Sequence, residues 1–438
     1  MPRLFITLAF TWLSLSGFSQ STLHSLVGYL HNWNDANAPY IQPDQIDSRY
    51  NIIEVAFATP TSPLDMNMVF VPDVITQSAF ITKVQTLQAQ GKKVLISIGG
   101  ASTTVDLTTT PNKNAFINTM TSIINTYGFD GIDIDIENGA SILINGGTIA
   151  APAGVAQINL IDAIKQIMAT YHTAHAKKLM LTMAPETAYV QGGQSGFGGI
   201  WGGYLPVIHA LRDSLDILQV QLYNSGSMYG IDNNIYTQGT ADFIIAMTEA
   251  VIHGFSTAGG YFTGLPANKV AVGLPACNLA AGGGYTDTNV VRSAMKYLLG
   301  TGNKPGSYTL SNAGGYPTLK GMMTWSINWD AVATCNGAYA YATNYQNIFG
   351  TTTSTEQTSD NPDKLLIYPN PAASILNIEC PQYQNLNVSI SNMIGEQVIQ
   401  RVIKGSKEAV DISSLPSGLY VVKVLGEDWT GERKLIKE

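Results

Sequence analysis

The sequence predicts an α/β fold, a TIM (β/α)8 barrel, followed by a small C-terminal β-sandwich. Three observations support this fold class. Eight strand-like apolar runs alternate with helix-like stretches, a polar linker follows them, and short alternating runs without a helical period fill the end of the chain. The 438 residues suffice for one large barrel and a smaller module. A doubly wound open sheet is the alternative, but no glycine-rich phosphate loop follows the first strand.

The first residues have the layout of a cleaved secretory signal peptide, which we expect over residues 1–19. One arginine precedes an apolar run from Leu4 to Leu15, and small residues stand at Gly17 and Ser19. The run is shorter than the roughly 20 residues that span a bilayer, and no later stretch is long enough. An uncleaved anchor is the alternative. We therefore expect an exported protein without a transmembrane segment.

The barrel is expected over residues 20–350. Its predicted strands are 26–31, 52–57, 94–98, 132–137, 179–183, 217–223, 270–274 and 322–327. Between the strands, apolar residues recur with helical spacing over 116–127 and 160–171. Tyr341, Tyr345 and Ile348 predict a last helix that ends at Gly350.

Residues 351–363 contain no apolar residue and predict a linker. Beyond it, residues 364–438 hold roughly seven short alternating runs separated by turns. This pattern predicts a β-sandwich of about 75 residues.

Composition and cysteine usage limit the function. Only 12% of the residues are charged and the net charge is −8, which argues against nucleic acid or an anionic membrane as partner. The balance suits a neutral, hydroxyl-rich ligand such as a polysaccharide. Cys277 and Cys335 follow the seventh and eighth predicted strands, so they could form a disulfide. We favour the interpretation that both cysteines are isolated small apolar residues. With Cys380 they form no zinc or redox motif.

The stretch DGIDIDIE, residues 130–137, carries the chemistry. On a strand, its alternation places Asp133, Asp135 and Glu137 in one row and three isoleucines in the other. The apolar row needs a packed partner, whereas the acidic row is costly to bury unless it is solvated, hydrogen-bonded or partly protonated. A barrel strand whose isoleucines pack under helices and whose carboxyls point into an open mouth meets both demands.

Catalytic groups of α/β barrels lie at the carboxyl ends of strands, and Glu137 is the last residue of its predicted strand. Two more carboxyls on the same face can hold it partly protonated, so that it acts as general acid and then as general base. A calcium or magnesium site is the competing interpretation. The strict alternation, the lack of an EF-hand glycine and the absence of a nearby histidine argue against it, and we expect no metal and no cofactor.

DGIDIDIE resembles the DGxDxDxE motif of family 18 glycoside hydrolases, the chitinase family. Four further motifs follow in the family's order, each at the end of a predicted strand: SIGG (97–100), MAPE (183–186), QLYN (221–224) and WSINWD (325–330). The resemblance covers roughly residues 25–350.

The resemblance implies a role for each of five residues. Glu137 would protonate the glycosidic oxygen, Asp135 would orient the substrate's acetamido group and stabilise the oxazolinium ion, and Asp133 would share a proton with Asp135. Tyr223 would hydrogen-bond the acetamido carbonyl, and Trp325 would form the aromatic floor. This substrate-assisted scheme is an exception to the two-carboxylate mechanism of glycosidases.

The sequence also departs from the common pattern. Many family members carry Met-x-Tyr-Asp on the sixth strand, whereas this chain has Gln221 and Asn224 beside Tyr223. This variant, with APETAYVQGG over 184–193, resembles the chitinase D type of bacterial enzyme. Only about fifteen residues, 277–291, follow the seventh strand before the next helix-like stretch. They leave no room for an inserted α+β domain, which favours a shallow groove and endo cleavage.

Further substrate-binding residues are expected near strand ends, where aromatic rings can stack on sugars. The aromatic candidates are Tyr29, Trp33, Tyr189 and Trp201, with loop packing as the alternative. Gly99 and Gly100 are also expected to bind substrate. His172 and His175 are interpreted as solvated surface residues and not as a metal pair.

The C-terminal module has a resemblance of its own. IYPNPA (367–372), LPSGLYVVKV and a terminal KLIK resemble the sorting domain of the type IX secretion system of Bacteroidetes. This implies crossing of the outer membrane through the type IX machinery, with a carbohydrate-binding sandwich as the alternative.

Together these features predict a chitinase, secreted or attached at the cell surface, monomeric, and acting on chitin or N-acetylglucosamine oligosaccharides. The alternatives are an endo-β-N-acetylglucosaminidase acting on the chitobiose core of N-glycans and a non-catalytic chitin-binding lectin on the same fold.

Overall fold

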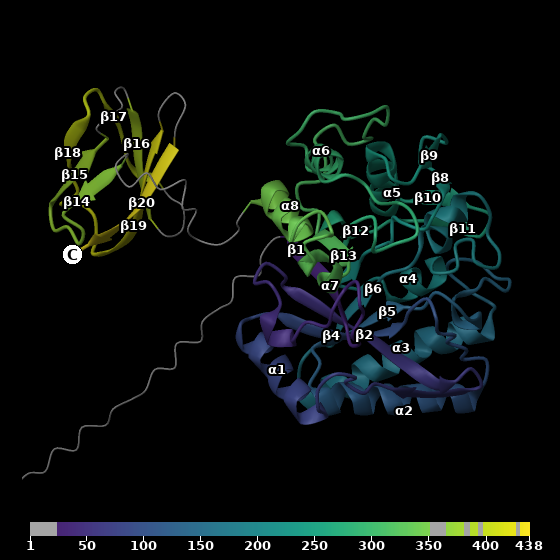
Figure 1. Ribbon diagram of the computed structural model, residues 1–438. Coiled ribbons are helices and arrows are strands. Elements are labelled where there is room, and N and C mark those ends of the chain that lie inside the picture. The colour runs from purple at the N-terminus through teal and green to yellow at the C-terminus, as the bar shows by residue number, and fades with distance from the viewer. Residues whose placement is uncertain (1–23, 351–364, 381–385, 393–396, 426–429) are drawn as a thin grey trace, which may run out of the picture. The chain divides into compact units, whose positions relative to one another are not determined.

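The structure is a computed structural model that describes residues 24–350, 365–380, 386–392, 397–425 and 430–438. The expected signal peptide, residues 1–19, and the expected linker, residues 351–363, lie outside the described residues. The described residues fall into two compact units that divide between Thr352 and Thr353 (Figure 1).

Eight parallel strands form the centre of the first unit, as the sequence predicts. They are β1 (Ser25–His31), β2 (Ile52–Ser62), β4 (Lys93–Gly99), β5 (Gly131–Asp135), β6 (Met180–Met183), β7 (Ile217–Leu218), β12 (Ala271–Pro275) and β13 (Gly321–Trp325). Their order in the sheet is β12-β13-β1-β2-β4-β5-β6-β7. Single bridges from Leu218 to Val270 and from Gln221 to Gly273 connect β7 to β12 and complete the ring.

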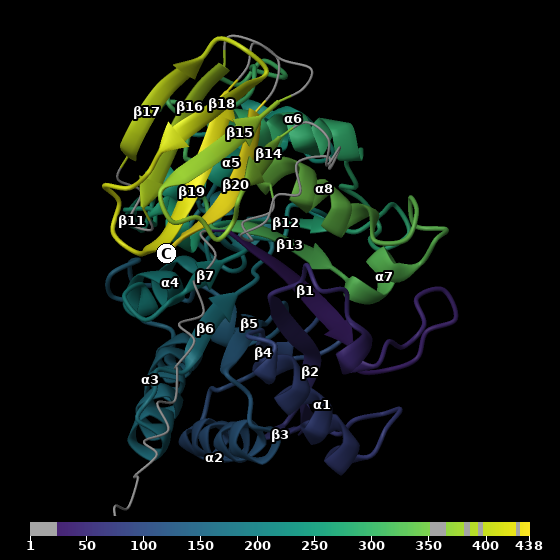
Figure 2. The same ribbon diagram turned by 90° about the vertical axis from the view of Figure 1, so that its left-hand side faces the viewer.

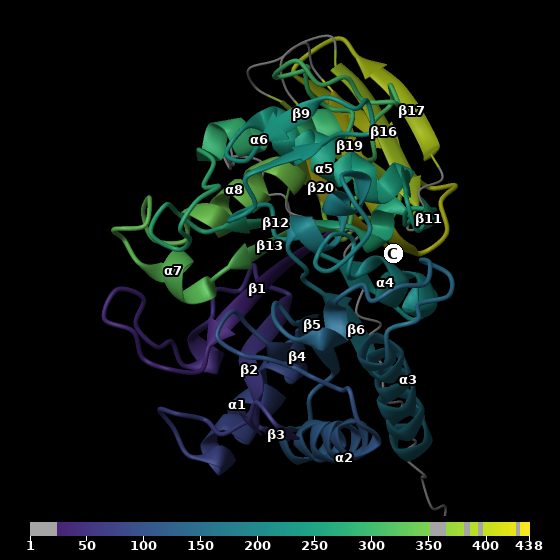
Figure 3. The same ribbon diagram turned by 90° about the vertical axis from the view of Figure 1, so that its right-hand side faces the viewer.

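Helices cover the outside of this ring. In Figures 2 and 3, α1, α2 and α3 lie outside β4, β5 and β6. The helices are α1 (Gln77–Ala89), α2 (Thr110–Tyr127), α3 (Val155–His175), α4 (Leu205–Leu211), α5 (Ala241–His253), α6 (Thr288–Leu298), α7 (Ile327–Ala331) and α8 (Ala340–Phe349). The helical periods over 116–127 and 160–171 are confirmed as the buried faces of α2 and α3, and α8 ends at Gly350 as predicted. Short 3-10 turns occur at η1 (Pro43–Gln45), η2 (Ala140–Ile142), η3 (Thr187–Tyr189), η4 (Gln191–Gln194) and η5 (Ala267–Lys269).

Additional strands in the loops were not predicted. β2 extends to Ser62 and pairs with the antiparallel β3 (Asp65–Val69). Two hairpins, β8 (Ser227–Tyr229) with β9 (Ile235–Thr237) and β10 (Phe255–Thr257) with β11 (Gly260–Phe262), lie between β7 and β12. Each of these four strands has three residues, which is too short for an alternating pattern to stand out in the sequence.

The two faces of β5 meet two different cores. Ile132, Ile134 and Ile136 are buried in the large core between the strands and the helices. The inside of the barrel holds a second, smaller apolar cluster that includes Tyr29 and Met323. The isoleucine row therefore packs under helices, as the alternation predicts.

The described residues of the second unit form seven strands, where the sequence predicts roughly seven. They are β14 (Leu366–Tyr368), β15 (Ile375–Glu379), β16 (Leu386–Asn392), β17 (Gln397–Ile403), β18 (Lys407–Asp411), β19 (Gly418–Leu425) and β20 (Thr430–Lys437). They form a three-stranded sheet, β14-β15-β18, and a four-stranded sheet, β17-β16-β19-β20. Residues of both sheets share one apolar core, including Leu376 and Val422, so the unit is a β-sandwich.

Among the described residues, we find no helix whose length and apolar character would let it cross a membrane.

Candidate active site

The register of three neighbouring strands places polar side chains in one row inside the barrel. Asp133 on β5 is opposite Ser97 on β4 and opposite Thr182 on β6. All three side chains are fully buried. Because side chains on neighbouring strands at one level of the pleat point to the same side, this row forms a polar layer in the barrel interior.

Asp133 is the main hydrogen-bond acceptor of this layer. Tyr29 and Ser97 each donate a hydroxyl to Asp133 Oδ2 at 2.7 Å, and Thr182 Oγ1 lies 2.7 Å from Oδ1. Burial raises the pKa of Asp133, and these hydrogen bonds oppose the rise. The acidic row was expected to point into an open mouth, but Asp133 is 0% exposed and depends on hydrogen bonds instead of water.

The strand that carries the row ends earlier than predicted. β5 stops at Asp135, so Glu137 lies two residues beyond it and is not the last strand residue. The cause is Tyr204, whose hydroxyl accepts a hydrogen bond from Ile136 N and donates to Ile136 O, the groups that a continued ladder would use. Tyr189 donates its hydroxyl to Glu137 O at 2.6 Å and fixes the next residue.

Glycine at the end of β4 lets the two strands approach closely at this level. A Cβ atom on Gly99, whose φ is +114°, would lie 2.4 Å from Asp135 O. The next amide, Gly100 N, donates to that carbonyl at 2.7 Å. A side chain at Gly99 would therefore displace the backbone that carries Asp135.

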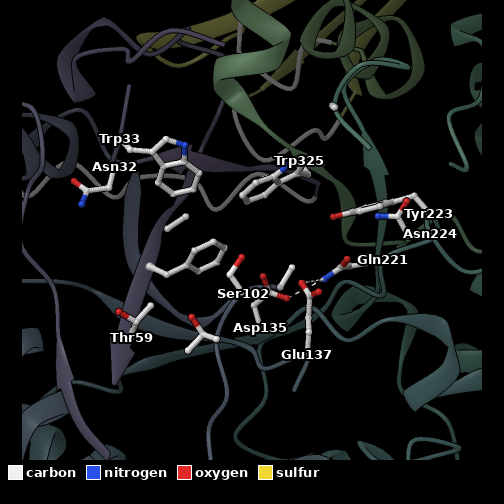
Figure 4. A pocket seen from close by; sticks show the side chains of 17 residues that line it. Asn32, Trp33, Thr59, Ser102, Asp135, Glu137, Gln221, Tyr223, Asn224 and Trp325 are labelled. Carbon is white, nitrogen blue, oxygen red and sulfur yellow. Dashed lines mark hydrogen bonds between the residues drawn. The ribbon is translucent and has the colours of Figure 1, made fainter. Parts of the chain in front are cut away.

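One amide connects the two outer carboxyls of the row. Gln221 Nε2 donates to Asp135 Oδ1 at 2.8 Å and lies 3.2 Å from Glu137 Oε1, as Figure 4 shows. Its third acceptor, Ala184 O at 2.9 Å, holds the amide in place. Gln221 therefore fixes the distance and the orientation between Asp135 and the half-buried Glu137.

The pKa values of the two outer carboxyls are both raised. Burial raises the pKa of Asp135 well above its ordinary range, and the charges of Glu137 and Asp133 raise it further. Burial also raises the pKa of Glu137, while the hydrogen bond from Gln221 lowers it. Such a pair holds a proton at a pH where isolated carboxyls are ionised, so Glu137 can act as a general acid.

A cavity of about 470 Å³ opens above these carboxyls. Asp135 and Glu137 are the carboxyls among the described residues that line it. The full lining consists of Asn32, Trp33, Ala56, Phe57, Thr59, Gly99, Gly100, Ala101, Ser102, Thr103, Asp135, Glu137, Gln221, Tyr223, Asn224, Ala280 and Trp325. The structure thus brings together, at one cavity, nine of the thirteen residues singled out in the sequence.

Aromatic rings form the side of the cavity opposite Glu137 and Gln221 (Figure 4). Trp325 stacks on Phe57 with ring centroids 5.8 Å apart and planes 12° apart. Trp33 stacks on His31 at 4.6 Å, and His31 also contacts Trp325 at 4.9 Å. Burial lowers the pKa of His31 to about 4, so its ring is neutral and serves as an apolar support for the tryptophans. Apolar ring faces beside polar groups suit a sugar ring.

Tyr223 and Asn224 form the wall next to Gln221. The hydroxyl of Tyr223 points into the cavity (Figure 4), and burial, with the charges of Asp135 and Glu137, raises its pKa well above the ordinary value. The phenol therefore stays a hydrogen-bond donor. Asn224, with φ at +52°, accepts a hydrogen bond from Gly283 N through Oδ1 at 3.0 Å and so attaches the loop after β12 to this wall.

Three residues expected to bind substrate do not line the cavity. Tyr29 is 1% exposed and lies below the floor, where it donates to Asp133. Tyr189 is 6% exposed and holds the backbone of Glu137. Trp201 is 40% exposed, but it packs near Gly192, away from the cavity lining. For these residues, proximity to a strand end in the sequence did not place the ring at the cavity.

Two carboxyls near the site were not singled out as site residues. Glu54 on β2 is 0% exposed and lies beside the Asp133 layer. Its signal in the sequence was a single charged residue within the apolar run of the second strand. Glu186 belongs to the MAPE motif, and burial, with the charge of Glu137, raises its pKa to about 7.

Cys277 and Cys335 form a disulfide, with Cα atoms 5.3 Å apart, which corrects the interpretation of two isolated cysteines. They join the loop after β12 to the segment after α7. With Ala276 and Ala280 they form a small buried cluster, against which Trp325 packs. The disulfide therefore supports the cavity wall that carries the aromatic floor. Cys380 is free and buried.

The described residues contain no group of three or more His, Cys, Asp or Glu side chains that could hold a metal ion. His172 and His175 are exposed on α3, and His175 contacts Asn125.

Comparisons with known proteins find matches for both parts of the chain. Residues 25–361 match the Glycosyl hydrolases family 18, and residues 366–438 match the Secretion system C-terminal sorting domain, which confirms both resemblances. The chain is 45% identical over 312 residues to Chitinase D of Niallia circulans, covering 70% of this chain and 58% of that protein. It is 33% identical over 438 residues to Chitinase ChiA of Flavobacterium johnsoniae, covering 94% of this chain and 27% of that protein.

A crystal structure of a family GH18 chitinase from Chromobacterium violaceum superposes with a TM-score of 0.66 at 33% identity, covering 75% of this chain and 84% of that one. The chain spans less than two thirds of the length of the two curated relatives, so the comparisons establish the family and the fold. Because the family model matches most of the chain, this protein is a member of the glycosyl hydrolases family 18.

Proposed function

We propose that the protein is a secreted chitinase that hydrolyses β-1,4 linkages between N-acetylglucosamine units with retention of configuration. The observation that carries this proposal is the carboxyl arrangement at the cavity. Glu137 is half-buried and raised in pKa, Asp135 is buried directly beside it, and Gln221 holds the two together. Chitinase D of Niallia circulans and the structure from Chromobacterium violaceum, both named chitinases, support the substrate class.

In the proposed first step, Glu137 gives its proton to the glycosidic oxygen while the carbonyl oxygen of the substrate's acetamido group attacks C1. The bond from C1 to the leaving sugar breaks, and an oxazolinium ion forms. Asp135 accepts a hydrogen bond from the nitrogen of this ion, and the Tyr223 hydroxyl donates to its oxygen. The neutral state of Tyr223, which its raised pKa maintains, keeps this donor available.

In the second step, Glu137 removes a proton from water as the water attacks C1. The bond from C1 to the acetamido oxygen breaks, the acetamido group is restored, and Glu137 regains its proton. The substrate supplies the nucleophile, so one acid/base and one charge-stabilising carboxylate are sufficient. Trp325 is proposed as the floor under the sugar at the cleavage point, and Asp133 as the anion that fixes Asp135.

We also propose endo cleavage. The connection from β12 to α6 holds no helix or strand, and the disulfide at Cys277 fastens its start. The cavity is therefore not walled by an inserted domain on that side, so a long chain can lie across it.

Export is proposed to use the signal peptide over residues 1–19 and the C-terminal sandwich, which the sorting-domain match supports. The type IX secretion machinery is then the partner of the sandwich, and the barrel acts as a monomer after the sorting module is removed or attached at the surface.

Replacement of Glu137 with Gln tests the catalytic role. Since Gln keeps the shape but has no proton to transfer, we expect hydrolysis of chitin oligomers to fall at least about 100-fold while the melting temperature stays within a few degrees. A variant that retains most of the activity would contradict the role. Offering the wild-type protein chitin oligomers and a high-mannose glycoprotein side by side, with the products sized, tests the substrate class; cleavage of the glycoprotein alone, or binding without cleavage, would overturn the proposal.

A further inference from the structure

The barrel interior contains a fourth carboxyl for which the proposed mechanism has no use. Glu54 projects from β2, where it lies opposite Tyr29 of β1 in the sheet register, and it is 0% exposed. Gln219 Nε2 donates to it and lies 2.7 Å from each of its two oxygens. Glu54 therefore lies beside the polar layer of Asp133, below the cavity floor.

The two contacts that Thr182 makes with Glu54 and Asp133 require a proton on one of these carboxyls. Thr182 Oγ1 lies 2.8 Å from Glu54 Oε1 and 2.7 Å from Asp133 Oδ1. A threonine hydroxyl has one hydrogen, so it can donate to only one of these two oxygens. The other contact is a hydrogen bond only if that carboxyl is protonated and donates to Thr182. If both carboxyls were ionised, one buried carboxylate oxygen would face Thr182 Oγ1 without a hydrogen between them.

The surroundings show which carboxyl holds the proton. Asp133 receives two hydroxyl donors on Oδ2, from Tyr29 and Ser97, and these stabilise its ionised form. Glu54 accepts the amide of Gln219, and the Tyr29 hydroxyl, which lies 2.7 Å from Asp133 Oδ2, also acts on Glu54 and lowers its pKa. Burial raises the pKa of Glu54 well above its ordinary value, and the charge of Asp133 raises it further, which agrees with this assignment.

The titratable groups that face Glu54 come from two other strands of the barrel, β1 and β5. Tyr29 extends from β1 and Asp133 from β5, with Asp135 one step further along β5. Thr182, from β6, and Gln219, from the segment after β7, bring no charge.

We propose that Glu54 is a positioning residue that stays protonated at neutral pH and donates to Thr182, so that Thr182 donates to Asp133 and Asp133 is the buried anion of the layer. This inference rests on the proposed function for its catalytic consequence. The charge on Asp133 raises the pKa of Asp135, the carboxyl beside Glu137. A neutral Glu54 thus sets the pH range in which the catalytic pair works, without touching the substrate.

Infrared difference spectroscopy on the full chain tests the protonation state without any need for activity. The spectrum of the wild-type protein minus that of Glu54→Gln at pH 7 should contain one carbonyl-stretch band of a protonated carboxylic acid. A protonated carboxyl elsewhere in the site is present in both proteins and cancels. A difference spectrum that contains a carboxylate band in place of the acid band would overturn the proposal, whether or not the protein hydrolyses chitin.

The pH dependence of kcat/KM for a chitin oligomer tests the consequence. Gln at position 54 mimics the protonated acid, so kcat/KM should stay within about threefold and both limbs within about 0.3 pH unit. If Glu54 were ionised, its replacement would remove a buried negative charge, lower the pKa of Asp135 and move a limb by about one pH unit or more. That result would overturn the proposal.

Thr182 supplies the matched pair of variants. Thr182→Val removes the hydroxyl that connects the two carboxyls, so the pH profile should shift by about one unit, whereas Thr182→Ser keeps the hydroxyl and should retain the wild-type profile. A wild-type profile in Thr182→Val would show that the connection only fills space and would refute the positioning role. If the valine variant fails to fold, the infrared measurement on Glu54→Gln still decides the protonation state.

Discussion

Replacing Gln221 with Met should weaken catalysis and raise the pH range of activity. Methionine has nearly the same length and volume, so the change removes the amide and little else. The amide is 2.8 Å from Asp135 Oδ1 and 3.2 Å from Glu137 Oε1, and its bonds lower the pKa of both carboxyls. Hydrogen bonds to charged groups contribute about 1.5–3 kcal/mol, and 1.36 kcal/mol corresponds to a factor of ten. We therefore expect kcat/KM to fall about 10- to 100-fold.

The direction of the pH shift follows from the same contacts. Without the donor, the ionised forms of Asp135 and Glu137 lose stabilisation, so both pKa values rise and the proton is kept to higher pH. The alkaline limb of kcat/KM should move upward by about one unit, measured with a chromogenic N-acetylglucosamine oligosaccharide. Gln157→Met is the control, because Gln157 is also buried but donates to Gly203 O at 2.7 Å, away from the carboxyls. Activity within twofold of wild type and an unmoved limb in Gln221→Met would refute the reasoning.

Three further predictions concern the surroundings of the site. Glu186→Gln removes a charge that forms above pH 7 beside Glu137, so the alkaline limb of kcat/KM should move to lower pH. The raised pKa of Glu186 also means that the stability of the wild type falls as the pH rises from 4.5 to about 7. The melting temperature of the variant should therefore fall less than that of the wild type over this interval, and equal slopes would contradict this. Replacing Cys277 and Cys335 with Ser should lower the free energy of unfolding by about 4 kcal/mol, because the bond closes 58 residues of sequence; denaturant titration checks this, and a midpoint equal to that of the oxidised wild type would rule it out. Trp33→Ala should raise KM about 3- to 10-fold with little change in kcat, and a loss confined to kcat would exclude a stacking role.

The sequence was sufficient for features that repeat along one strand or one helix. The alternation of isoleucine and carboxyl over 130–137 predicted a strand with one face under helices. Ile132 and Ile134 are buried in the core between the strands and the helices. The motif QLYN predicted that Gln221 and Tyr223 reach the cavity, and both line it.

Features that depend on residues far apart in sequence were missed or misplaced. The end of β5 is set by Tyr204, 68 residues away from Ile136, so no local pattern marks it. The partners of Glu54, Gln219 among them, come from other strands of the barrel, and only the closed ring brings them together. The disulfide depends in the same way on two loops that meet only after the barrel has closed.

The pairing of β5 with its neighbours makes the chemistry a property of strand alignment. Ser97, Asp133 and Thr182 meet because they hold equivalent positions on β4, β5 and β6. A slip of one residue would turn every carboxyl toward the helices and every isoleucine toward the substrate. Insertions and deletions should therefore be tolerated in the loops that shape the groove and rejected within these three strands. New glycan preferences can then evolve in the loops, while the inner layer of the barrel keeps the reaction itself unchanged.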